Sequence, residues 1–352
     1  MFVLLLIASL AHALYPPAQP TGSRPSVVGP PPADWAASVS SGDMLFWGGA
    51  LPDAGHFPSV GNGYVAKEVG PWHSVGAMND FGYFYLAGVF NGVGNTTPSH
   101  RAAIPDAADV RLRTGNPIGA ALDLRGGAFL NRTLVRESAC DGVQIQQRTY
   151  AHRAERSLFV VELRASKIEG GVWPAAGCAL TLDWVVGTTS PDFNISLPQP
   201  AQMGPVVMSL VTIEAETPDA PLRRVAMAYP AWLDAAGGAP NVTFASSGDV
   251  LLAAIVLRSD LDAEDPAAAA ASDWVRLTAM GADALLASHT AAWATLWDTG
   301  GIELEGNLTV AAAANSSLYA ILSALRADVN SSTCPGGLST NSYNGHTFWV
   351  RR

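Results

Sequence analysis

Leu158-Phe-Val-Val-Glu-Leu163 and Val250-Leu-Leu-Ala-Ala-Ile-Val-Leu257 are short apolar runs with β-branched residues. Runs of this length and composition are typical of β-strands. Similar runs, separated by Gly, Pro, Asn and Asp, recur from about Gly42 onward: one opens at Val143, and others span Ala179 to Val186, Val211 to Ala215 and Val225 to Tyr229. No helical pattern alternates with them, which disfavours a parallel α/β sheet and predicts a β-sandwich.

The last quarter of the chain has a different pattern. Between Trp274 and Trp297 there is no proline, and apolar residues recur at helical spacing. Trp293 and Trp297 stand one turn apart on the apolar side. We interpret this side as a stripe that docks the helix between two domains, rather than as an aromatic binding platform. Residues Leu308 to Val329 predict a second helix, which Asn307 can cap.

Composition limits the classes of partner. The 352 residues are 49% hydrophobic, enough to bury a large core in about two domains. A formal net charge of -10 argues against nucleic acid and anionic membranes, which both need basic surface. No Cys-x-x-Cys or His-x-x-x-His spacing occurs, so we predict no metal site, and nothing in the sequence calls for a cofactor.

The beginning of the chain predicts export. Residues 1-13 combine an apolar run with Ala11-x-Ala13, the pattern of a signal peptide, and residues 14-41 are a predicted Pro/Gly-rich linker. No later apolar run is long enough for a membrane span. We therefore predict the secretory pathway, ending outside the cell or in a lysosome or vacuole. Seven asparagines stand in glycosylation acceptors and are predicted to be exposed: Asn95, Asn131, Asn194, Asn241, Asn307, Asn315 and Asn330.

The chain has three cysteines, an odd number for an oxidising compartment. Cys140 and Cys178 both fall in the β-rich region and can form a disulfide, which leaves Cys334 over. The alternative is that all three are buried thiols, and the sequence leaves both possibilities open.

The stretch that points to chemistry is Cys334-Pro-Gly-Gly-Leu-Ser-Thr-Asn-Ser-Tyr-Asn-Gly-His-Thr-Phe-Trp349. Aromatic faces stack on the apolar faces of a pyranose, and polar groups fix its hydroxyls. A loop rich in glycine and hydroxyl groups that leads into His346, Phe348 and Trp349 therefore suits a sugar pocket. The alternative interpretation is a plain loop followed by a core anchor.

Pro335-Gly-Gly-Leu-Ser339, followed by Tyr343-x-Gly-His-x-Phe-Trp349, resembles the start of the catalytic barrel of glycoside hydrolase family 65. In that family an Asp follows the Trp, and the pair holds a glucose. This chain has Val350 at the position of the Asp, and a valine side chain cannot accept a hydrogen bond from a sugar hydroxyl. The resemblance thus implies a substrate-binding set of Trp349, His346 and Phe348, with Val350 in place of the acid.

Motifs in the β-rich region resemble the N-terminal domain of the same family. They are Pro58-x-Val-Gly-Asn-Gly-Tyr64, Gly88-Val-Phe-Asn-Gly92, Ser99-His-Arg-Ala-x-x-Pro105, Asp123-Leu-Arg-x-Gly127 and Arg148-x-Tyr-x-His-Arg153. We expect His100, Arg101, Tyr150 and His152 to act mainly as framework. Ala292-Trp-Ala-Thr-Leu-Trp297 with Ile302-x-Leu-Glu-Gly306 resembles the helical linker that joins that domain to the barrel.

The resemblance implies a mainly β fold with a helical end: a β super-sandwich over residues 42-273, a helical linker over 274-306 and the first piece of an (α/α)6 barrel over 307-352. It implies an inverting α-glucosidase acting on glucosyl-galactosyl-hydroxylysine, as found on collagen, or on a related α-glucoside. Acid trehalase and disaccharide phosphorylase activities are alternatives from the same family. A further alternative is a non-catalytic secreted sandwich that binds carbohydrate or has a structural role.

An inverting glycosidase needs two carboxyl groups, one as general acid and one to activate water. In the resembled family the general acid is a Glu beyond the last residue of this chain, so we predict no catalytic residue within it. Glu303 and Glu305 fall in the linker and are interpreted as solvated charges. The 352 residues alone are therefore expected to have no glycosidase activity.

Overall fold

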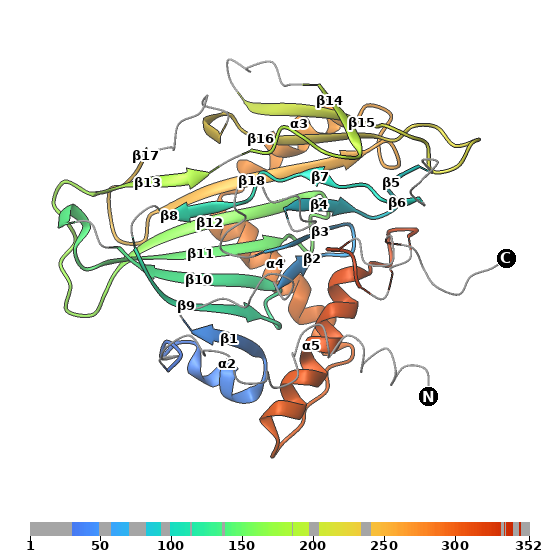
Figure 1. Cartoon of the computed structure of the whole chain (residues 1–352). Coiled ribbons are helices and arrows are strands. Elements are labelled where there is room, and N and C mark those ends of the chain that lie inside the picture. Colours follow the sequence, from blue (N-terminus) through green and yellow to red (C-terminus); the bar gives the residue numbers. More distant parts are fainter. Residues whose placement is uncertain are drawn as a thin grey trace, which may run out of the picture.

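The structure is a computed structural model, and it describes residues 30–48, 58–69, 82–92, 99–112, 115–135, 138–184, 186–196, 204–233, 241–331, 334, 336–340 and 345. The predicted signal peptide over residues 1-13 lies outside the described residues, as do Asn95, His346, Phe348, Trp349 and Val350. In the described part the chain is mainly β with helices at its C-terminal side, which confirms the predicted fold class (Figure 1).

A nine-stranded antiparallel sheet forms the centre of the fold. Two of its long central pairings are continuous in register, and nine pairs join Val143–Ala151 to its neighbour. In spatial order the strands are β1 (Met44–Gly48), β9 (Asn116–Asp123), β10 (Ala128–Leu134), β11 (Val143–Ala151), β12 (Leu158–Lys167), β18 (Val250–Ser259), β16 (Arg224–Pro230), β15 (Pro205–Thr212) and β14 (Phe193–Ser196).

Three smaller sheets pack against this central sheet. A four-stranded sheet has the order β2 (Ser59–Gly61), β3 (Val65–Glu68), β4 (Tyr83–Leu86) and β7 (Ile104–Pro105). A three-stranded sheet has the order β17 (Asn241–Phe244), β13 (Cys178–Trp184) and β8 (Val110–Leu112), and β5 (Phe90–Asn91) pairs with β6 (His100–Arg101). The main apolar core lies between the central sheet and these smaller sheets.

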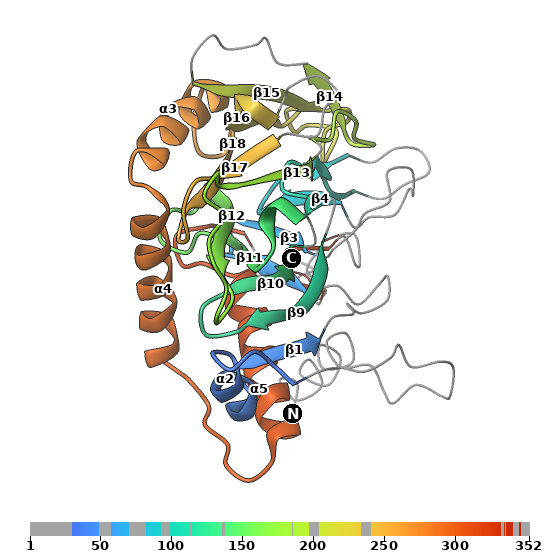
Figure 2. The same ribbon diagram turned by 90° about the vertical axis from the view of Figure 1, so that its left-hand side faces the viewer.

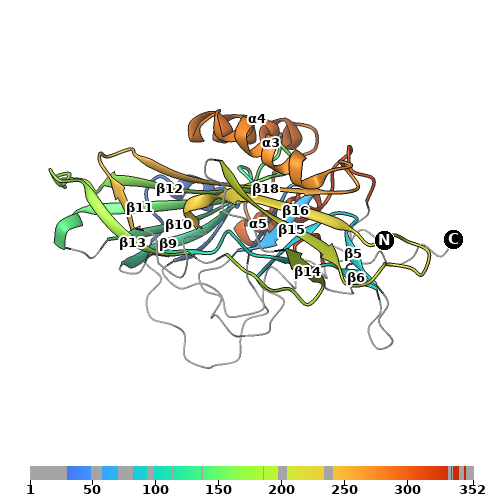
Figure 3. The same ribbon diagram turned by 90° about the horizontal axis from the view of Figure 1, so that it is seen from above.

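Strand β12 explains why the central runs are apolar at successive positions rather than at alternate ones. Phe159 and Val161 belong to the main core, whereas Leu158 and Val160 belong to a second core under the helices. Successive side chains of a strand point to opposite faces, so a strand buried on both faces reads as a continuous apolar run. Figures 2 and 3 show helices α3 (Pro266–Thr278) and α4 (Ala282–Asp298) on one face of the central sheet.

The helices differ in their bounds from the sequence prediction. The run from Trp274 to Trp297 is divided between α3 and α4, because Gly281 adopts φ +78° between them. Helix α5 spans Leu308–Ala324 and ends five residues before the predicted Val329. Helix α2 (Ala36–Ser41) lies within the predicted linker over residues 14-41, so its last part is regular structure. No helix in the described ranges has the length and apolarity that a membrane crossing needs.

Trp293 and Trp297 face inward from α4. Trp293 is fully buried and stacks on Tyr319 of α5, with ring centroids 5.4 Å apart. The indole N–H of Trp297 donates to the carbonyl of Leu124 at 3.1 Å, and the Arg125 guanidinium lies 4.4 Å from the centre of its ring. The two indoles therefore dock α4 between the sandwich and α5, and neither is an exposed binding platform.

The structure pairs Cys140 with Cys178 in a disulfide between η1 (Ser138–Cys140) and the start of β13. Cys334 is buried and does not take part in this bond. Of the two possibilities that the sequence left open, the structure has the single disulfide.

Sandwich residues hold the C-terminal end of α5. Arg153 Nη1 donates to the carbonyls of Leu322 at 2.8 Å and Leu325 at 3.2 Å, and the Gly63 N–H donates to Ser323 O at 2.8 Å. The last carbonyls of a helix have no partner within the helix, so these contacts satisfy them. At the other end the side chain of Asn307 accepts from the Val310 N–H, as a helix N-cap does.

Candidate functional site

The described part of the C-terminal stretch is a tight turn. The Gly337 N–H donates to Cys334 O at 3.0 Å, and Gly337 adopts φ +80°, a conformation that favours glycine. Leu338 is buried and forms a small apolar cluster with Ala66, Ala87 and Ala324. The described residues Gly336 to Ser339 therefore form a turn that Leu338 anchors against the sandwich and α5.

Arg101 of β6 holds the backbone of this turn. Its Nη1 lies 2.9, 3.0 and 2.9 Å from the carbonyl oxygens of Gly337, Leu338 and Thr340, and its Nη2 lies 3.1 Å from that of Gly345. The side chain is 1% exposed. The sequence motif around Arg101 and the loop motif, more than 230 residues apart, thus meet in one contact.

The other predicted framework residues lie inside the sandwich. His100 Nε2 lies 2.7 Å from Asp192 Oδ1, and Asp192 also accepts from the Ala103 N–H. Tyr150 and His152 are fully buried under α4. His152 Nε2 lies 2.9 Å from Leu285 O. These contacts give the three residues a positioning role within the sandwich.

His152 is part of a buried pair of imidazoles. Its ring centre lies 5.5 Å from that of His289, a residue of α4. His289 Nδ1 accepts from the Arg153 N–H at 3.0 Å, and Nε2 lies 2.8 Å from Gly126 O. Burial lowers the pKa of both rings, and it lowers that of His289 to about 3, with His152 and Arg148 acting in the same direction. Both imidazoles are therefore neutral at physiological pH.

We expect acid to destabilise the fold through His289. Between pH 6.5 and pH 3 the unfolded chain binds a proton that the folded chain does not, so stability falls as the pH falls through this window. The loss between pH 8 and pH 5 is about 2 kcal/mol from this residue, and His152 adds to it. Urea unfolding of wild type and His289→Gln at both pH values measures it. Equal pH dependence in the two proteins would contradict the assignment.

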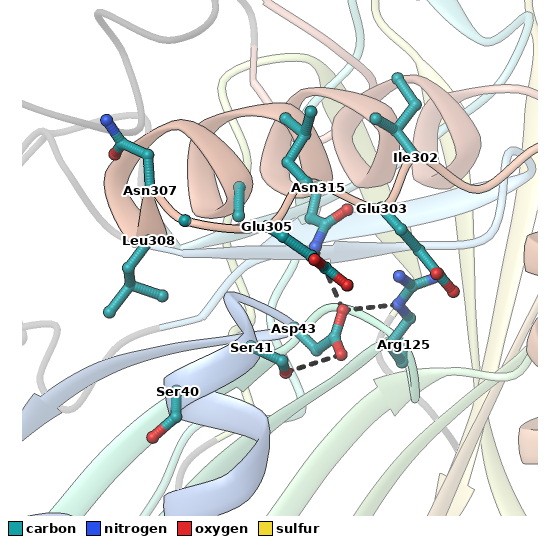
Figure 4. Close-up of a pocket in the computed structure, with 13 residues that line it drawn as sticks. Ser40, Ser41, Asp43, Arg125, Ile302, Glu303, Glu305, Asn307, Leu308 and Asn315 are labelled. Carbon is teal, nitrogen blue, oxygen red and sulfur yellow. Dashed lines mark hydrogen bonds and ion pairs between the residues drawn. The ribbon is translucent and has the colours of Figure 1, made fainter.

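A second polar site is a cavity of about 530 Å³ between α2, α5 and the segment that joins α4 to α5 (Figure 4). Asp43 is its centre. One carboxylate oxygen of Asp43 accepts from Arg125 Nε at 2.7 Å and Asn315 Nδ2 at 3.1 Å, and the other accepts from the Ser41 hydroxyl at 2.8 Å. This network joins the start of the sandwich to α5, which sequence reasoning did not identify.

The two glutamates of this cavity are exposed to solvent. Glu303 and Glu305 line its wall, and their exposure agrees with their interpretation as solvated charges. Both carboxylate oxygens of Asp43 already accept hydrogen bonds, from three donors in all. Within the described residues no group of three or more His, Cys, Asp or Glu side chains is arranged to hold a metal ion. The cavity is a polar junction between α2, α5 and the segment that joins α4 to α5.

Asn315 corrects one of the glycosylation predictions. The exposed acceptors are Asn194, Asn241, Asn307 and Asn330, and Asn131 is half-buried. Asn315 is 3% exposed, and its Nδ2 donates to Gly42 O at 3.2 Å and to Asp43. The predicted exposure is wrong here, because the acceptor motif falls on the face of α5 that packs against the sandwich.

We therefore expect no glycan on Asn315 in the folded protein, because the nitrogen that would carry it is buried and hydrogen-bonded. Enzymatic removal of glycans in heavy-oxygen water, followed by peptide mass spectrometry, marks each modified asparagine. Asn241 and Asn330 are exposed controls in the same sample. A heavy-oxygen label on Asn315 with the protein folded would refute the expectation.

The fold defines a class of protein: a large antiparallel β-sandwich that is followed by helices. A solved structure assigned as a kojibiose phosphorylase from the human microbiome superimposes with a TM-score of 0.66 at 10% identity, over 88% of this chain and 45% of that one. At this identity the likeness establishes the fold alone.

Sequence comparison identifies relatives. The chain is 28% identical over 334 residues to protein-glucosylgalactosylhydroxylysine glucosidase of Dictyostelium discoideum, covering 91% of this chain and 43% of the relative. It is 39% identical over 69 residues to kojibiose hydrolase of Mucilaginibacter mallensis, covering 20% and 10%. No model of a protein family matches the chain. The chain is a homologue of these glycosidases, as its resemblance to glycoside hydrolase family 65 implied, and it spans less than half the length of the relatives it matches.

Proposed function

We propose that this chain is the sandwich, linker and first barrel segment of an inverting α-glucosidase that removes a terminal glucose from glucosyl-galactosyl-hydroxylysine or a related α-glucoside. The observation that carries the proposal is the similarity to a glucosidase of that name along 91% of the chain. The Arg101-held turn supports it, because the turn fixes the backbone just before the residues expected to contact the sugar.

In this proposal Trp349, His346 and Phe348 line the glucose site, and Val350 stands where the family has an acid. A hydrolase needs a general acid and a second carboxylate to activate water. The relatives are more than twice as long as their matched part. We place both carboxylates in the corresponding remainder of a longer protein, so the 352 residues alone are expected to release no glucose.

The test compares two proteins, the purified 352-residue chain and the product of the complete transcript from the same source. Each is incubated with glucosyl-galactosyl-hydroxylysine, kojibiose and trehalose, with and without phosphate. Glucose released by the longer protein alone, as the β-anomer and independently of phosphate, supports an inverting hydrolase. Glucose 1-phosphate would support a phosphorylase instead, and a preference for trehalose would support a trehalase.

Activity in neither protein would overturn the proposal. Binding of α-glucosides without turnover would then favour a non-catalytic secreted sandwich. Glucose release by the 352-residue chain itself would refute the placement of the carboxylates outside it.

We further propose that the protein enters the secretory pathway and ends outside the cell or in a lysosome or vacuole. The Cys140–Cys178 disulfide supports this location, because disulfides persist in oxidising compartments. Four acceptor asparagines on the surface agree with it. Glycan occupancy at Asn241 and Asn330 in protein from its natural source tests it, and unmodified peptides at all exposed acceptors would contradict it.

A further inference from the structure

We propose that Arg101 is a positioning residue for the sugar-binding stretch: from the sandwich it holds the backbone carbonyls of Gly337, Leu338, Thr340 and Gly345, and Gly345 directly precedes His346 in the sequence. The role in sugar binding rests on the proposed function. The contact itself does not, and it can be tested separately.

The geometry of the contact suits a guanidinium. Four carbonyl oxygens, those of Gly337, Leu338, Thr340 and Gly345, lie between 2.9 and 3.1 Å from its two terminal nitrogens. A guanidinium is planar and carries five N–H donors in a fixed fork, whereas a lysine ammonium is a compact group on a flexible stem. Lysine at position 101 can therefore reach some of these oxygens but cannot hold all four in one arrangement.

The loop is shaped to the arginine. Gly345 adopts φ +71°, and a Cβ on it would lie 2.7 Å from Arg101 Cβ and 3.1 Å from Nε. A side chain at position 345 would therefore push the loop off the arginine. The glycine in the Gly345-His346 part of the motif has a steric reason, since it lets the chain pass directly over the buried guanidinium.

The contact also covers Cys334. This cysteine is 3% exposed, its Sγ lies 3.2 Å from Gly337 O, and that same oxygen accepts from Arg101. If Arg101 is removed, the loop loses the group on which four of its carbonyls converge, and the thiol becomes accessible. Cys334 is thus a built-in reporter of loop position that requires no substrate.

Displacement of the loop should weaken substrate binding more than it slows the chemistry. The proposed carboxylates belong to another part of the protein, whereas the glucose contacts follow Gly345 directly. A contact that holds the substrate equally in the ground state and in the transition state affects KM and leaves kcat unchanged. We therefore expect a rise in KM of about tenfold or more, with kcat changed much less.

The experiment uses the longer protein with Arg101→Ala, Arg101→Lys and Arg132→Ala. Arg132 is the matched control, because it is also buried, at 9% exposure. It lies on β10 and forms an ion pair with Asp34, with 2.6 Å between Nη2 and Oδ2. For each protein we would measure KM and kcat for the α-glucoside and the unfolding temperature. Peptide mass spectrometry would give the rate at which a maleimide labels Cys334.

We expect Arg101→Ala to raise KM about tenfold and to speed Cys334 labelling about tenfold. Both values for Arg101→Lys should lie between those of wild type and Arg101→Ala, and Arg132→Ala should change neither value. Millimolar guanidinium, but not equal urea or sodium chloride, should restore both values in Arg101→Ala by refilling the space. A merely destabilised fold would not respond to guanidinium in this way.

Unchanged KM and unchanged labelling in a folded Arg101→Ala protein would overturn the proposal, and so would failure of guanidinium to restore either. If Arg101→Ala does not fold, the comparison of Arg101→Lys with wild type decides in the same way. If wild type releases no glucose from any α-glucoside, the proposed function has failed. The labelling rates of Cys334 then decide alone whether Arg101 positions the loop.

Discussion

Replacing Trp293 by alanine is expected to lower the free energy of unfolding by about 4 kcal/mol, the largest loss that we predict for a single substitution. The indole is fully buried, stacks on Tyr319 of α5, and lies 5.4 Å from the Arg153 guanidinium. It therefore joins three parts of the fold: α4, α5 and the sandwich. Truncation leaves a cavity at their junction, because the tightly packed surroundings relax only partly. Chemical unfolding with urea measures the loss.

Trp173→Ala is the matched control. Trp173 is half-buried, and its indole N–H donates to Ala245 O at the surface of the sandwich. The same substitution there removes less buried area and should cost less than half as much. Trp293→Phe keeps a ring against Tyr319 and is expected to fall between the two. Equal losses at Trp293 and Trp173 would show that Trp293 does not join α4 to α5 and the sandwich.

The strands and the fold class could be predicted because their signals are local. Alternating or continuous apolar runs mark a strand whatever surrounds it, so the runs at Leu158, Val225 and Val250 match β12, β16 and β18. The run placed at Val211 to Ala215 was misplaced, since β15 spans Pro205–Thr212. The bounds of β15 follow its pairing with β16, which begins at Pro205, and an apolar run alone does not show where such a pairing begins or ends.

Long-range contacts left no local signal. Nothing in the sequence near Arg101 indicates that its guanidinium reaches carbonyls more than 230 residues later. The buried acceptor Asn315 is a similar case, because a three-residue glycosylation motif does not reveal which face of a helix is covered. The break between α3 and α4 depends on one glycine, Gly281, in an otherwise helical pattern, where a glycine alone is weak information.

The Gly61-Asn62-Gly63 turn has both a local sequence signal and a long-range contact. This turn belongs to one of the sequence motifs, but the motif alone does not explain why its glycines are needed. In the structure a Cβ on Gly61 would lie 2.6 Å from Ser323 O, and one on Gly63 would lie 2.5 Å from Leu325 O. The glycines are therefore needed where the sandwich meets the end of α5, because no side chain fits between the two backbones.

Gly63→Ala is accordingly expected to destabilise the protein by about 3 kcal/mol, from a left-handed backbone that costs a non-glycine residue about 1 kcal/mol and from overpacking against α5. Gly306→Ala separates the two causes, because Gly306 has nearly the same φ, +85° against +83°, but nothing within 4 Å of a Cβ. Urea unfolding of both variants should give a loss at Gly63 about 2 kcal/mol larger than at Gly306. Equal losses would mean that backbone conformation alone explains Gly63 and that α5 does not press on this turn. The larger loss would establish that contact, on which the position of α5 against the sandwich depends.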